Sequence, residues 1–528
     1  MRFFKSAFYL LALLTSLVSV YSYAATITGI VKGPNDVPVK GVFVQARDTK
    51  HHITTSVLSD QAGKYRFAHL KAGDYEFRIA AVGYRADPKP IANLTEDKIL
   101  ALDWSLERAP VRWSEISYDV GHRLLPDVRG KAELEKYCLQ CHSFQSRMAA
   151  NRKDESGWRD QVNFMREAMH YRLWEMTDAD VNAIVSYLST VFGQDSTLPK
   201  SVNDVPEYQK LVRPLSDEAT DIVYVEYDMP APNLMPWSAV PDGKGSLWIP
   251  CFGDANQIRK LNPETGETKS FKAPFQGTAG IHSVMPAPDG SVWFTEQGSN
   301  SVAKLDSLTQ KITEYQDAQA AGKEGIQAGG SKNTLRIDKQ GMVWATGGPL
   351  SRFDPKTNKF TDFPEVQDPY GITVDHRSDV WFAEYAPDGK IGKIDSKTLK
   401  IKKWEIPTPH AMPRRIEEDS DGNIWFGEFK TGKIGRFDPK TERFQEFALP
   451  GPSASPYALQ IDKAGRIWYA SFDEDVVGRL DPKTGHVTEY PFPQSEMMLR
   501  EFFLDAEGRM WFGAPANNKV GYFYLQEK

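Results

Sequence analysis

The stretch DGNIWFGEFKTGKIGRFDPKTERFQEF, residues 421–447, carries a pattern that recurs through the second half of the chain. It combines a DG turn, an apolar–Trp pair, an RFDPKT-like turn and a further alternating segment. The apolar–Trp pairs recur at spacings of 45, 51, 37, 44, 43 and 43 residues and end on Trp248, Trp293, Trp344, Trp381, Trp425, Trp468 and Trp511. A period of roughly 40 to 45 residues with about four short strands is typical of a β-propeller blade. The seven tryptophans therefore predict seven blades.

The two ends of this region predict how the ring of blades closes. The last unit stops at NKVGYFYLQEK, after its third strand, whereas an additional strand, IVYVEYDMP at 222–230, precedes the first full unit. Pairing this strand with the carboxy-terminal strands completes the last blade and hides both strand edges. We therefore expect the propeller to span residues 222–528.

The stretches DGSVWFTE, DGNIWFGE and GKIGRFDPKT make this region resemble the virginiamycin B lyase (streptogramin lyase) family. The resemblance implies a site in the central channel, where a histidine acts as general base and a glutamate helps to hold Mg²⁺. As repeat motifs, these stretches specify the blade of that family well and its reaction poorly.

His282 and Glu296, fourteen residues apart in the second blade, match that family pair by position. Histidine is a natural proton acceptor near neutral pH, and a carboxylate is a natural ligand for a hard metal ion. The family's second acidic ligand, however, falls on Gly280, and its histidine in the preceding blade falls on Met235 or Trp237. A magnesium-assisted carbon–oxygen lyase using His282 and Glu296 is therefore only an alternative interpretation.

Alignment of the units places one residue of each innermost strand near the mouth of the channel. These positions hold Met235 or Trp237, His282, Asn333, Tyr370, Arg414, Tyr457 and Arg500. The third residue after the tryptophan is polar in several blades and includes Glu296, Glu384 and Glu428. Charged and polar side chains around a channel predict a cavity for an unidentified small-molecule ligand. For the three glutamates, hydrogen bonding between neighbouring strands is the alternative.

Residues 115–195 show helical spacing and contain Cys138-Leu139-Gln140-Cys141-His142. This C-x-x-C-H pattern is the attachment signature of c-type haem. Two thiols three residues apart on a helix can each form a thioether to the porphyrin edge, and the next histidine reaches the iron. Zinc would need further Cys or His ligands nearby. We therefore expect one covalent haem c, held by Cys138, Cys141 and His142.

From CLQCH through GWRDQVNFM to MTDADVNAIVSYLSTVFG, the segment resembles small monohaem cytochromes c. That resemblance implies an all-α domain with a methionine as the second axial ligand, and W-x-x-x-V-x-x-M points to Met165. The alternative ligands are Met169, Met176, Met148 and His170. A His/Met pair raises the potential and favours electron transfer.

Residues 1–24 have two early basic residues, then an apolar run, then small residues, which predicts a Sec-type secretory signal peptide. No other stretch approaches the roughly 18 apolar residues that a membrane span needs. The formal net charge is −6, and basic residues do not cluster, so nucleic acid is a poor candidate partner. We expect a periplasmic or secreted bacterial protein without a transmembrane segment in its mature chain.

Residues 25–108 alternate apolar and polar side chains in short runs, which predicts a small β-sandwich. The stretches TGIVKGPNDVPVKGVFVQA and SDQAGKYRFAHLKAGDYEFRIAAVGY resemble the carboxypeptidase regulatory-like (prealbumin-like) family, which implies a non-catalytic adhesion or spacer role. We expect His51 and His52 on opposite faces of a strand, and hence not as a metal pair. Residues 196–221 read as a linker.

These parts predict a multidomain chain with a β-sandwich, an all-α cytochrome c domain and a seven-bladed β-propeller. The favoured function is electron transfer through one haem, with the propeller binding a substrate or partner. Electrons pass to or from a redox partner protein or a small-molecule donor, which makes a haem-linked oxidoreductase one outcome. The alternatives are the lyase and a non-catalytic haem-containing binding or sensor protein.

Overall fold

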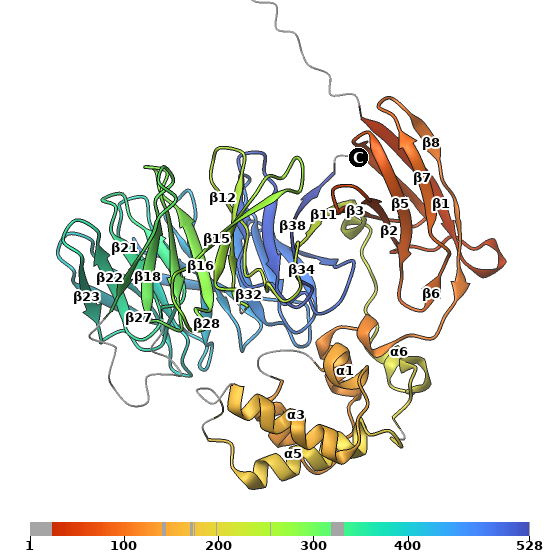
Figure 1. Cartoon of the computed structure of the whole chain (residues 1–528), viewed down its shortest axis with the longest axis horizontal. Helices are drawn as coiled ribbons and strands as arrows, with labels where there is room; N and C mark the ends of the chain where they lie inside the picture. The colour runs from red at the N-terminus through yellow and green to blue at the C-terminus, as the bar shows by residue number, and fades with distance from the viewer. Residues whose placement is uncertain are drawn as a thin grey trace, which may run out of the picture.

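A computed structural model describes residues 24–139, 144–168, 173, 175–196, 198–253, 255–317 and 332–526. The predicted signal peptide lies almost entirely outside these residues, as do Cys141, His142, Met169 and His170. Figure 1 shows the amino-terminal sandwich beside the propeller and the helices below both. Within the described part of the chain, no helix is long and apolar enough to cross a membrane.

The amino-terminal module is the predicted β-sandwich. One sheet has the order β4-β1-β8, with β9 also paired to β1; the other contains β3-β2-β5-β7, and β10 pairs with β6. Phe67, Phe77 and Trp104 are buried between the sheets. The strands are β1 (Ala25–Lys32), β2 (Phe43–Asp48), β3 (Ile53–Leu58), β4 (Lys64–Leu70), β5 (Gly73–Ala80), β6 (Tyr84–Arg85), β7 (Lys89–Leu94), β8 (Ile99–Ala101), β9 (Trp104–Ser105) and β10 (Glu107–Arg108).

The expectation that His51 and His52 lie on a strand is wrong, because both residues occupy the turn between β2 and β3. The Asp48 carboxylate organises this turn by accepting hydrogen bonds from the backbone N–H groups of Lys50 and His51. His52 has a φ of +56°, which an extended strand does not allow.

The middle of the chain forms short helices around its own core. The helices are α1 (Tyr118–Leu124), α2 (Lys131–Tyr137), α3 (Glu155–Ala168), α5 (Asp178–Val191) and α6 (Tyr208–Leu211). Trp158, Ile184 and Tyr187 are buried where these helices meet. The predicted linker, residues 196–221, contributes to this core through Val202 and Tyr208.

The propeller begins with three four-stranded sheets, which we call blades 1 to 3. Blade 1 comprises β12 (Val240–Pro241), β13 (Leu247–Cys251), β14 (Gln257–Leu261) and β15 (Thr268–Lys272). Blade 2 comprises β16 (Ile281–Pro286), β17 (Val292–Glu296), β18 (Ser301–Leu305) and β19 (Ile312–Gln316). Blade 3 comprises β20 (Leu335–Ile337), β21 (Val343–Ala345), β22 (Leu350–Asp354) and β23 (Lys359–Phe363).

Three further four-stranded sheets form blades 4 to 6. Blade 4 comprises β24 (Pro369–Val374), β25 (Val380–Glu384), β26 (Lys390–Ile394) and β27 (Ile401–Glu405). Blade 5 comprises β28 (Pro413–Glu418), β29 (Ile424–Glu428), β30 (Lys433–Asp438) and β31 (Arg443–Ala448). Blade 6 comprises β32 (Pro456–Ile461), β33 (Ile467–Ser471), β34 (Val476–Leu480) and β35 (Val487–Pro491).

Blade 7 closes the ring as the sequence predicts. Its strands are β36 (Phe503–Leu504), β37 (Met510–Ala514), β38 (Lys519–Leu525) and the early strand β11 (Ile222–Asp228). β11 pairs antiparallel with β38 along its whole length, from Ile222 opposite Leu525 to Asp228 opposite Lys519. Its other edge pairs with β3 of the sandwich, so one eight-stranded sheet runs from the propeller into the amino-terminal module. The sequence did not predict this continuity.

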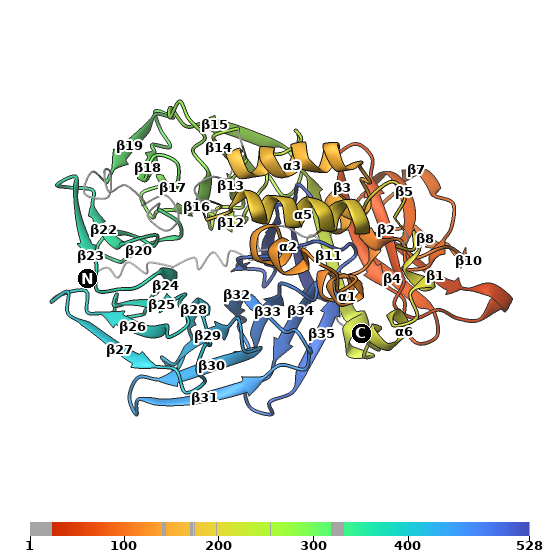
Figure 2. The ribbon, with the colours of Figure 1, turned by 90° about the horizontal axis from the view of Figure 1, so that it is seen from below.

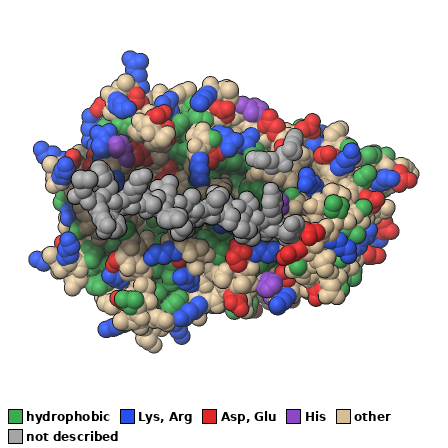
Figure 3. Space-filling view, turned by 90° about the horizontal axis from the view of Figure 1, so that it is seen from above, with side chains coloured by type: hydrophobic (Ala, Val, Ile, Leu, Met, Phe, Trp, Pro, Cys, Tyr) green, Lys and Arg blue, Asp and Glu red, His purple; other side chains and the backbone are tan. Residues whose placement is uncertain are grey.

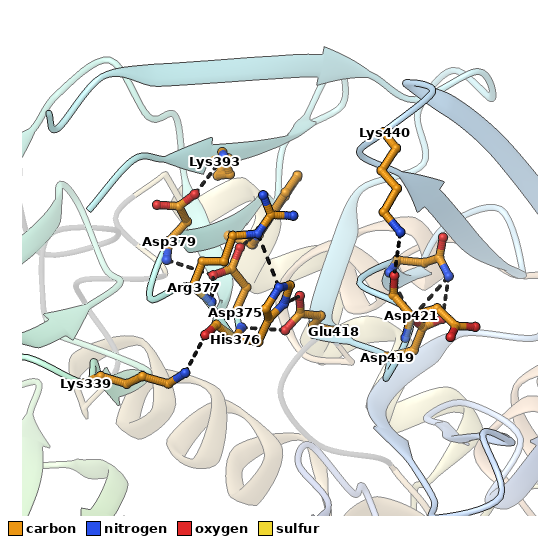
Figure 4. Close-up of polar contacts among 12 residues, drawn as sticks. Lys339, Asp375, His376, Arg377, Asp379, Lys393, Glu418, Asp419, Asp421 and Lys440 are labelled. Atoms are coloured by element: carbon orange, nitrogen blue, oxygen red, sulfur yellow. Dashed lines mark hydrogen bonds and ion pairs between the residues drawn. The ribbon is translucent and has the colours of Figure 1, made fainter. Parts of the chain in front are cut away.

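In five of the seven blades, an aspartate six residues before the recurring tryptophan fixes its indole. In blade 5, the Asp419 carboxylate accepts hydrogen bonds from Asp421 N (2.9 Å), Asn423 N (2.8 Å) and Trp425 Nε1 (2.8 Å). Figure 4 shows this turn beside the equivalent Asp375 turn of blade 4. The same indole-to-carboxylate bond forms in blades 3, 6 and 7. One carboxylate thus closes the tight turn and satisfies a buried indole N–H.

Candidate binding site at the propeller mouth

Arg414, at the start of blade 5, lies inside a group of aromatic rings. Its guanidinium carbon is 4.0 Å from the ring centre of Tyr457, 4.1 Å from those of Tyr385 and Phe429, and 4.9 Å from that of Tyr370. Its Nη2 donates a hydrogen bond to Tyr385 Oη at 2.8 Å. No carboxylate within the described ranges forms an ion pair with Arg414. Cation–π contacts therefore hold this charge in place.

Arg500 occupies the equivalent position in blade 7 and has similar surroundings. Its guanidinium carbon lies 4.2 Å from the ring centre of Trp237 and 5.0 Å from that of Phe472. Its Nη1 donates to Met498 O at 2.9 Å, and the side chain is buried. The rings of Trp237 and Phe252 in turn lie 5.1 Å and 6.1 Å from that of His282. Blades 1, 2, 4, 5, 6 and 7 therefore contribute to one arginine–aromatic cluster, made of Trp237, Phe252, His282, Tyr370, Tyr385, Arg414, Phe429, Tyr457, Phe472 and Arg500.

Two of the three tyrosines of the cluster, Tyr370 and Tyr457, have pKa values shifted in opposite directions. The hydroxyl groups of Tyr370 and Tyr457 are hydrogen-bonded to each other. Burial opposes ionisation of Tyr457, but Arg414, Arg500 and Arg415 outweigh it and hold the pKa of Tyr457 below its ordinary value. Burial and the neighbouring Tyr457 raise the pKa of Tyr370. Tyr457 is therefore the more acidic phenol of the pair.

Below the cluster, a second set of charges crosses the channel. Arg415 lies 3.2 Å from the carboxylate of Glu501 and donates through Nη1 to Thr334 Oγ1 at 2.7 Å. Arg336 lies 3.5 Å from Glu501 and 3.7 Å from Glu417. These arginines form ion pairs with carboxylates, whereas Arg414 has its ring and phenol contacts and a longer-range attraction to Asp473.

In the described part of the chain, His282 and Glu296 have different contacts. His282 faces the aromatic rings of blade 1, whereas Glu296 accepts a hydrogen bond from Ser299 Oγ at 2.8 Å within blade 2. Burial, assisted by Glu314, raises the pKa of Glu296 to about 7. Within the described residues, no group of three or more His, Cys, Asp and Glu side chains could hold a metal ion.

Glu384 and Glu428 likewise contact groups of their own blades. Glu384 forms an ion pair with Lys403 at 2.6 Å and accepts from Gln367 N at 2.9 Å. Glu428 accepts from Thr431 Oγ1 at 2.8 Å, and burial raises its pKa to about 7. These contacts favour the strand-bonding interpretation over a place in the ligand cavity.

Asn333 holds blade 3 to blade 2. Its backbone oxygen accepts a hydrogen bond from Thr295 Oγ1 at 2.6 Å, and its side-chain oxygen accepts one from Thr334 Oγ1 at 3.0 Å. It is half-buried, like Tyr370 and Arg414. No described contact joins Asn333 to the arginine–aromatic cluster, so blade 3 is the one blade without a residue in that cluster.

Sequence reasoning missed the aromatic half of the cluster by one residue. Phe252, Tyr385, Phe429 and Phe472 are each the fourth residue after a blade tryptophan, whereas the prediction used the third. The third residue is the last of its strand and stays within the blade; the fourth is the first residue beyond the strand. The signal was an aromatic residue at this position in four of seven repeats.

Of the predicted haem-binding residues, Cys138 and Met165 are described. Cys138 caps the carboxy-terminal end of α2 and packs against the core of the helical region. Met165 is half-buried on α3. The alternative ligands Met148 and Met176 are buried in the same core.

The helical region contacts the rim of the propeller mouth. Asp119 N donates to Asp473 O at 2.7 Å, and Arg123 Nη2 donates to Ser453 Oγ at 3.0 Å. Asp473 directly follows Phe472, a member of the arginine–aromatic cluster. Figure 2, seen from below, shows the helices lying across this end of the propeller. The helical region therefore contacts the propeller at the end that holds the cluster.

Comparison with known proteins supports two of the three modules. Residues 26–107 match the carboxypeptidase regulatory-like domain, and residues 356–527 match the virginiamycin B lyase family. The chain therefore contains a carboxypeptidase regulatory-like domain and a virginiamycin B lyase-like propeller. Neither match covers the helical region, whose assignment as a cytochrome c domain stays a prediction. No curated protein matches the chain.

Solved structures resemble the propeller at low sequence identity. A streptogramin B lyase is 24% identical, with a TM-score of 0.52, over 59% of this chain and 100% of its own. Virginiamycin B lyase from Staphylococcus aureus is 23% identical, with a TM-score of 0.50, over 57% and 98%. A catalytically inactive form of the Staphylococcus enzyme with quinupristin is 24% identical, with a TM-score of 0.51, over the same shares. At this identity the likeness concerns the fold alone.

Proposed function

We propose that this protein is an exported c-type cytochrome that transfers electrons through one covalent haem and binds a substrate or partner at the propeller mouth. The observation that carries the proposal is the position of the helical region. The helical region contacts the propeller through Asp119 and Arg123, next to the arginine–aromatic cluster. If this region carries a haem, a redox centre and a candidate binding site belong to neighbouring parts of the chain.

The residues of the helical region fit a haem by their chemistry. Cys138 and Cys141 would hold the porphyrin by thioethers, and His142 and Met165 would bind the iron. Cys138 lies against an apolar core that contains Trp113, Phe144 and Trp158, and such a core excludes water from a flat apolar group. The haem supplies a one-electron redox centre when bound.

The propeller's part in the proposal is to hold and orient a ligand. Arg414 presents a positive charge that forms no close ion pair within the described ranges, and the surrounding rings offer flat apolar faces. A small molecule with an aromatic body and an anionic group is complementary to such a surface. Tyr457, acidified by its arginine neighbours, can donate a hydrogen bond or a proton to that ligand.

The surface agrees with a partner other than nucleic acid. Figure 3 shows lysine and arginine side chains interspersed with aspartate and glutamate over the face seen from above. Nucleic-acid binding needs a continuous basic patch. A redox protein partner or a small-molecule electron donor fits these charges better.

The haem is tested on the full-length protein. A haem stain after denaturing electrophoresis should mark the wild-type chain, and a reduced-minus-oxidised spectrum should show a c-type haem. The Cys138→Ser, Cys141→Ser double variant should lose the stain. Met165→Ala should lose the Met-to-iron charge-transfer band, whereas Met148→Ala should keep it. A wild-type chain without covalent haem would refute the proposal.

The role of the mouth is tested by a screen for compounds that reduce the haem. Candidate donors are mixed with the full-length wild type and with Arg414→Gln, and haem reduction is followed by absorbance. A true substrate should reduce the haem of the wild type at least about tenfold faster than that of the variant, since a buried charge-assisted contact is lost. Arg443→Gln, an exposed change on β31 of the same blade, is the control. Equal rates of haem reduction in all three proteins would show that the propeller mouth does not bind the substrate.

A further inference from the structure

A cavity of about 870 Å³ lies where blade 1 meets the sandwich. Its wall includes the β2–β3 turn with His51 and His52, Asp228 at the end of β11, and Arg259 and Thr268 on β14 and β15. Small-molecule sites commonly have volumes of about 300 to 1,000 Å³. The cavity is large enough for such a ligand and is separate from the propeller mouth.

The cavity is richer in cations than the rest of the molecule. Arg47, Arg259, Lys260 and Lys269 line it, against Asp228 and Glu267, in a chain whose formal net charge is −6. Some of these cations are neutralised: Arg47 pairs with Asp228 at 2.6 Å, and Lys260 lies 3.5 Å from Asp242. Arg259 differs from both.

Arg259 contacts only neutral oxygen atoms. Its Nε and Nη2 donate to Thr268 Oγ1 at 3.0 and 2.7 Å, and its Nη1 lies 3.4 Å from Gln257 Oε1. No carboxylate pairs with it in the described part of the chain. Burial lowers the pKa of Arg259, which reflects the cost of keeping this charge away from water. An anion in the cavity would offset that cost.

The blade repeat does not require an arginine at this position. Arg259 is opposite Ile249 in the β13–β14 ladder. The equivalent residues of the other blades are all small: Ala303, Ser351, Gly392, Gly435, Gly478 and Gly521. A Cβ at Gly435 would lie 2.2 Å from the Phe426 ring, so the usual blade has no room for a larger side chain. Among the described blades, only blade 1 has an arginine at this position, and that arginine lines the cavity.

Close backbone contacts fix the walls of the cavity. Gly266, with a φ of +70°, lies so near the sandwich that a Cβ there would be 2.7 Å from His51 O. Asp228 N donates to His52 O at 3.2 Å. The sandwich turn and the β14–β15 turn are therefore held in a defined relation, as a binding site requires.

We propose that this cavity between the sandwich and blade 1 binds a small molecule through a carboxylate or phosphate group that pairs with Arg259. The other cations attract the anion, and the hydrogen bonds from Arg259 to Thr268 hold the guanidinium ready for it. The site needs neither the haem nor the propeller mouth. The sandwich then acts as half of a binding site in addition to being a spacer.

Isothermal titration of the full-length protein with citrate and with pyrophosphate tests the proposal. The wild type should bind at least one of the two anions, and Arg259→Gln should bind it at least about tenfold more weakly, since a charge-assisted pair is lost. Arg259→Lys keeps the charge and should fall between them. Arg352→Gln, which changes the blade 3 counterpart of Lys260, is the matched control and should bind like the wild type.

Preference for citrate would identify a carboxylate ligand, and preference for pyrophosphate a phosphate ligand; both support the proposal. Thermal unfolding without ligand shows whether each variant is folded, and Arg259→Lys supplies a second comparison if Arg259→Gln is not. Absence of binding to both anions in the wild type would overturn the proposal. Equal affinity of the wild type and a folded Arg259→Gln would overturn it as well.

Discussion

Blade 5 contains both kinds of residue that shape this propeller, and comparing them separates stability from recognition. Asp419 lies at one end of the blade and binds Trp425, as its counterparts do in four other blades. Arg414 lies at the start of the same inner strand and contacts four aromatic rings that belong to this blade and its neighbours. The aspartate that recurs in most blades maintains the blade, whereas the position of Arg414 varies between blades and contributes to the arginine–aromatic cluster. Changes at repeated positions should therefore alter stability, and changes at the mouth should alter ligand response.

The largest loss of stability is expected for Gly435→Ala. The added Cβ would lie 2.2 Å from the ring of Phe426, and the crowded strand can relieve this clash only by moving. We expect a destabilisation of about 3 kcal/mol, measured by chemical denaturation. Ala303→Gly, at the same repeat position in blade 2, should cost only about 1 kcal/mol. If Gly435→Ala were as stable as the wild type, a side chain at this repeated position would not disturb the blade, and the prediction would be wrong.

A smaller loss is expected for Asp419→Ala. This change removes the acceptor of two backbone N–H groups and leaves the indole N–H of Trp425 without its carboxylate. The expected destabilisation is about 2 kcal/mol, seen as a lower midpoint of thermal unfolding. In blade 2 the corresponding residue is Ala287, so Ala287→Asp should raise the midpoint. A lower unfolding midpoint for Asp419→Ala and a higher one for Ala287→Asp would support a stabilising role for this aspartate. Midpoints that shift in the same direction would contradict it.

A third effect should depend on pH. Burial raises the pKa of Glu428 from 4.5 to about 7, so between these values the folded chain binds more protons than the unfolded chain. The contribution of Glu428 to stability must therefore fall as pH rises through this window. Glu428→Gln should remove this dependence and stabilise the protein above pH 7 by on the order of 1 kcal/mol, measured as unfolding midpoints across pH. The exposed Glu405→Gln should leave the dependence unchanged.

The smallest effect on stability is expected for Arg414→Gln, less than about 1 kcal/mol. The variant should instead raise the pKa of Tyr457, because Arg414 is the foremost of the three arginines that lower it. Ultraviolet absorbance of tyrosinate during a pH titration measures this change, with Arg443→Gln as control. If Arg414→Gln lost as much stability as Asp419→Ala, the proposed difference between blade-stabilising residues and residues of the propeller mouth would be wrong.

The sequence predicts the repeated parts of the molecule well because the same physical demand recurs. Each blade needs a tight turn, a buried tryptophan and alternating strands, and seven examples average out local irregularities. The number of strands in each repeat also predicts that residues 222–230 complete the last blade, and β11 pairs with β38. The sandwich is likewise visible in its alternation of apolar and polar residues.

The mouth is less predictable because its residues meet across blades rather than along the chain. Arg414, Tyr457 and Arg500 occupy aligned positions, which periodicity can find. Phe429 and Phe472 lie just beyond the ends of strands, where alternation no longer tells which way a side chain points. The sequence does not single out Arg259 for a related reason: its cavity is formed only when blade 1 packs against the sandwich.

The position of β11 has a consequence for the order in which the chain is completed. β11 is made before any other strand of the propeller, and its partner β38 is the last strand to be made. During this interval β11 would present two open edges, but β3 of the already finished sandwich can cover one of them. The other edge then serves as a template for the final strand. The amino-terminal module can therefore protect one edge of β11 until β38 is synthesised and pairs with the other edge.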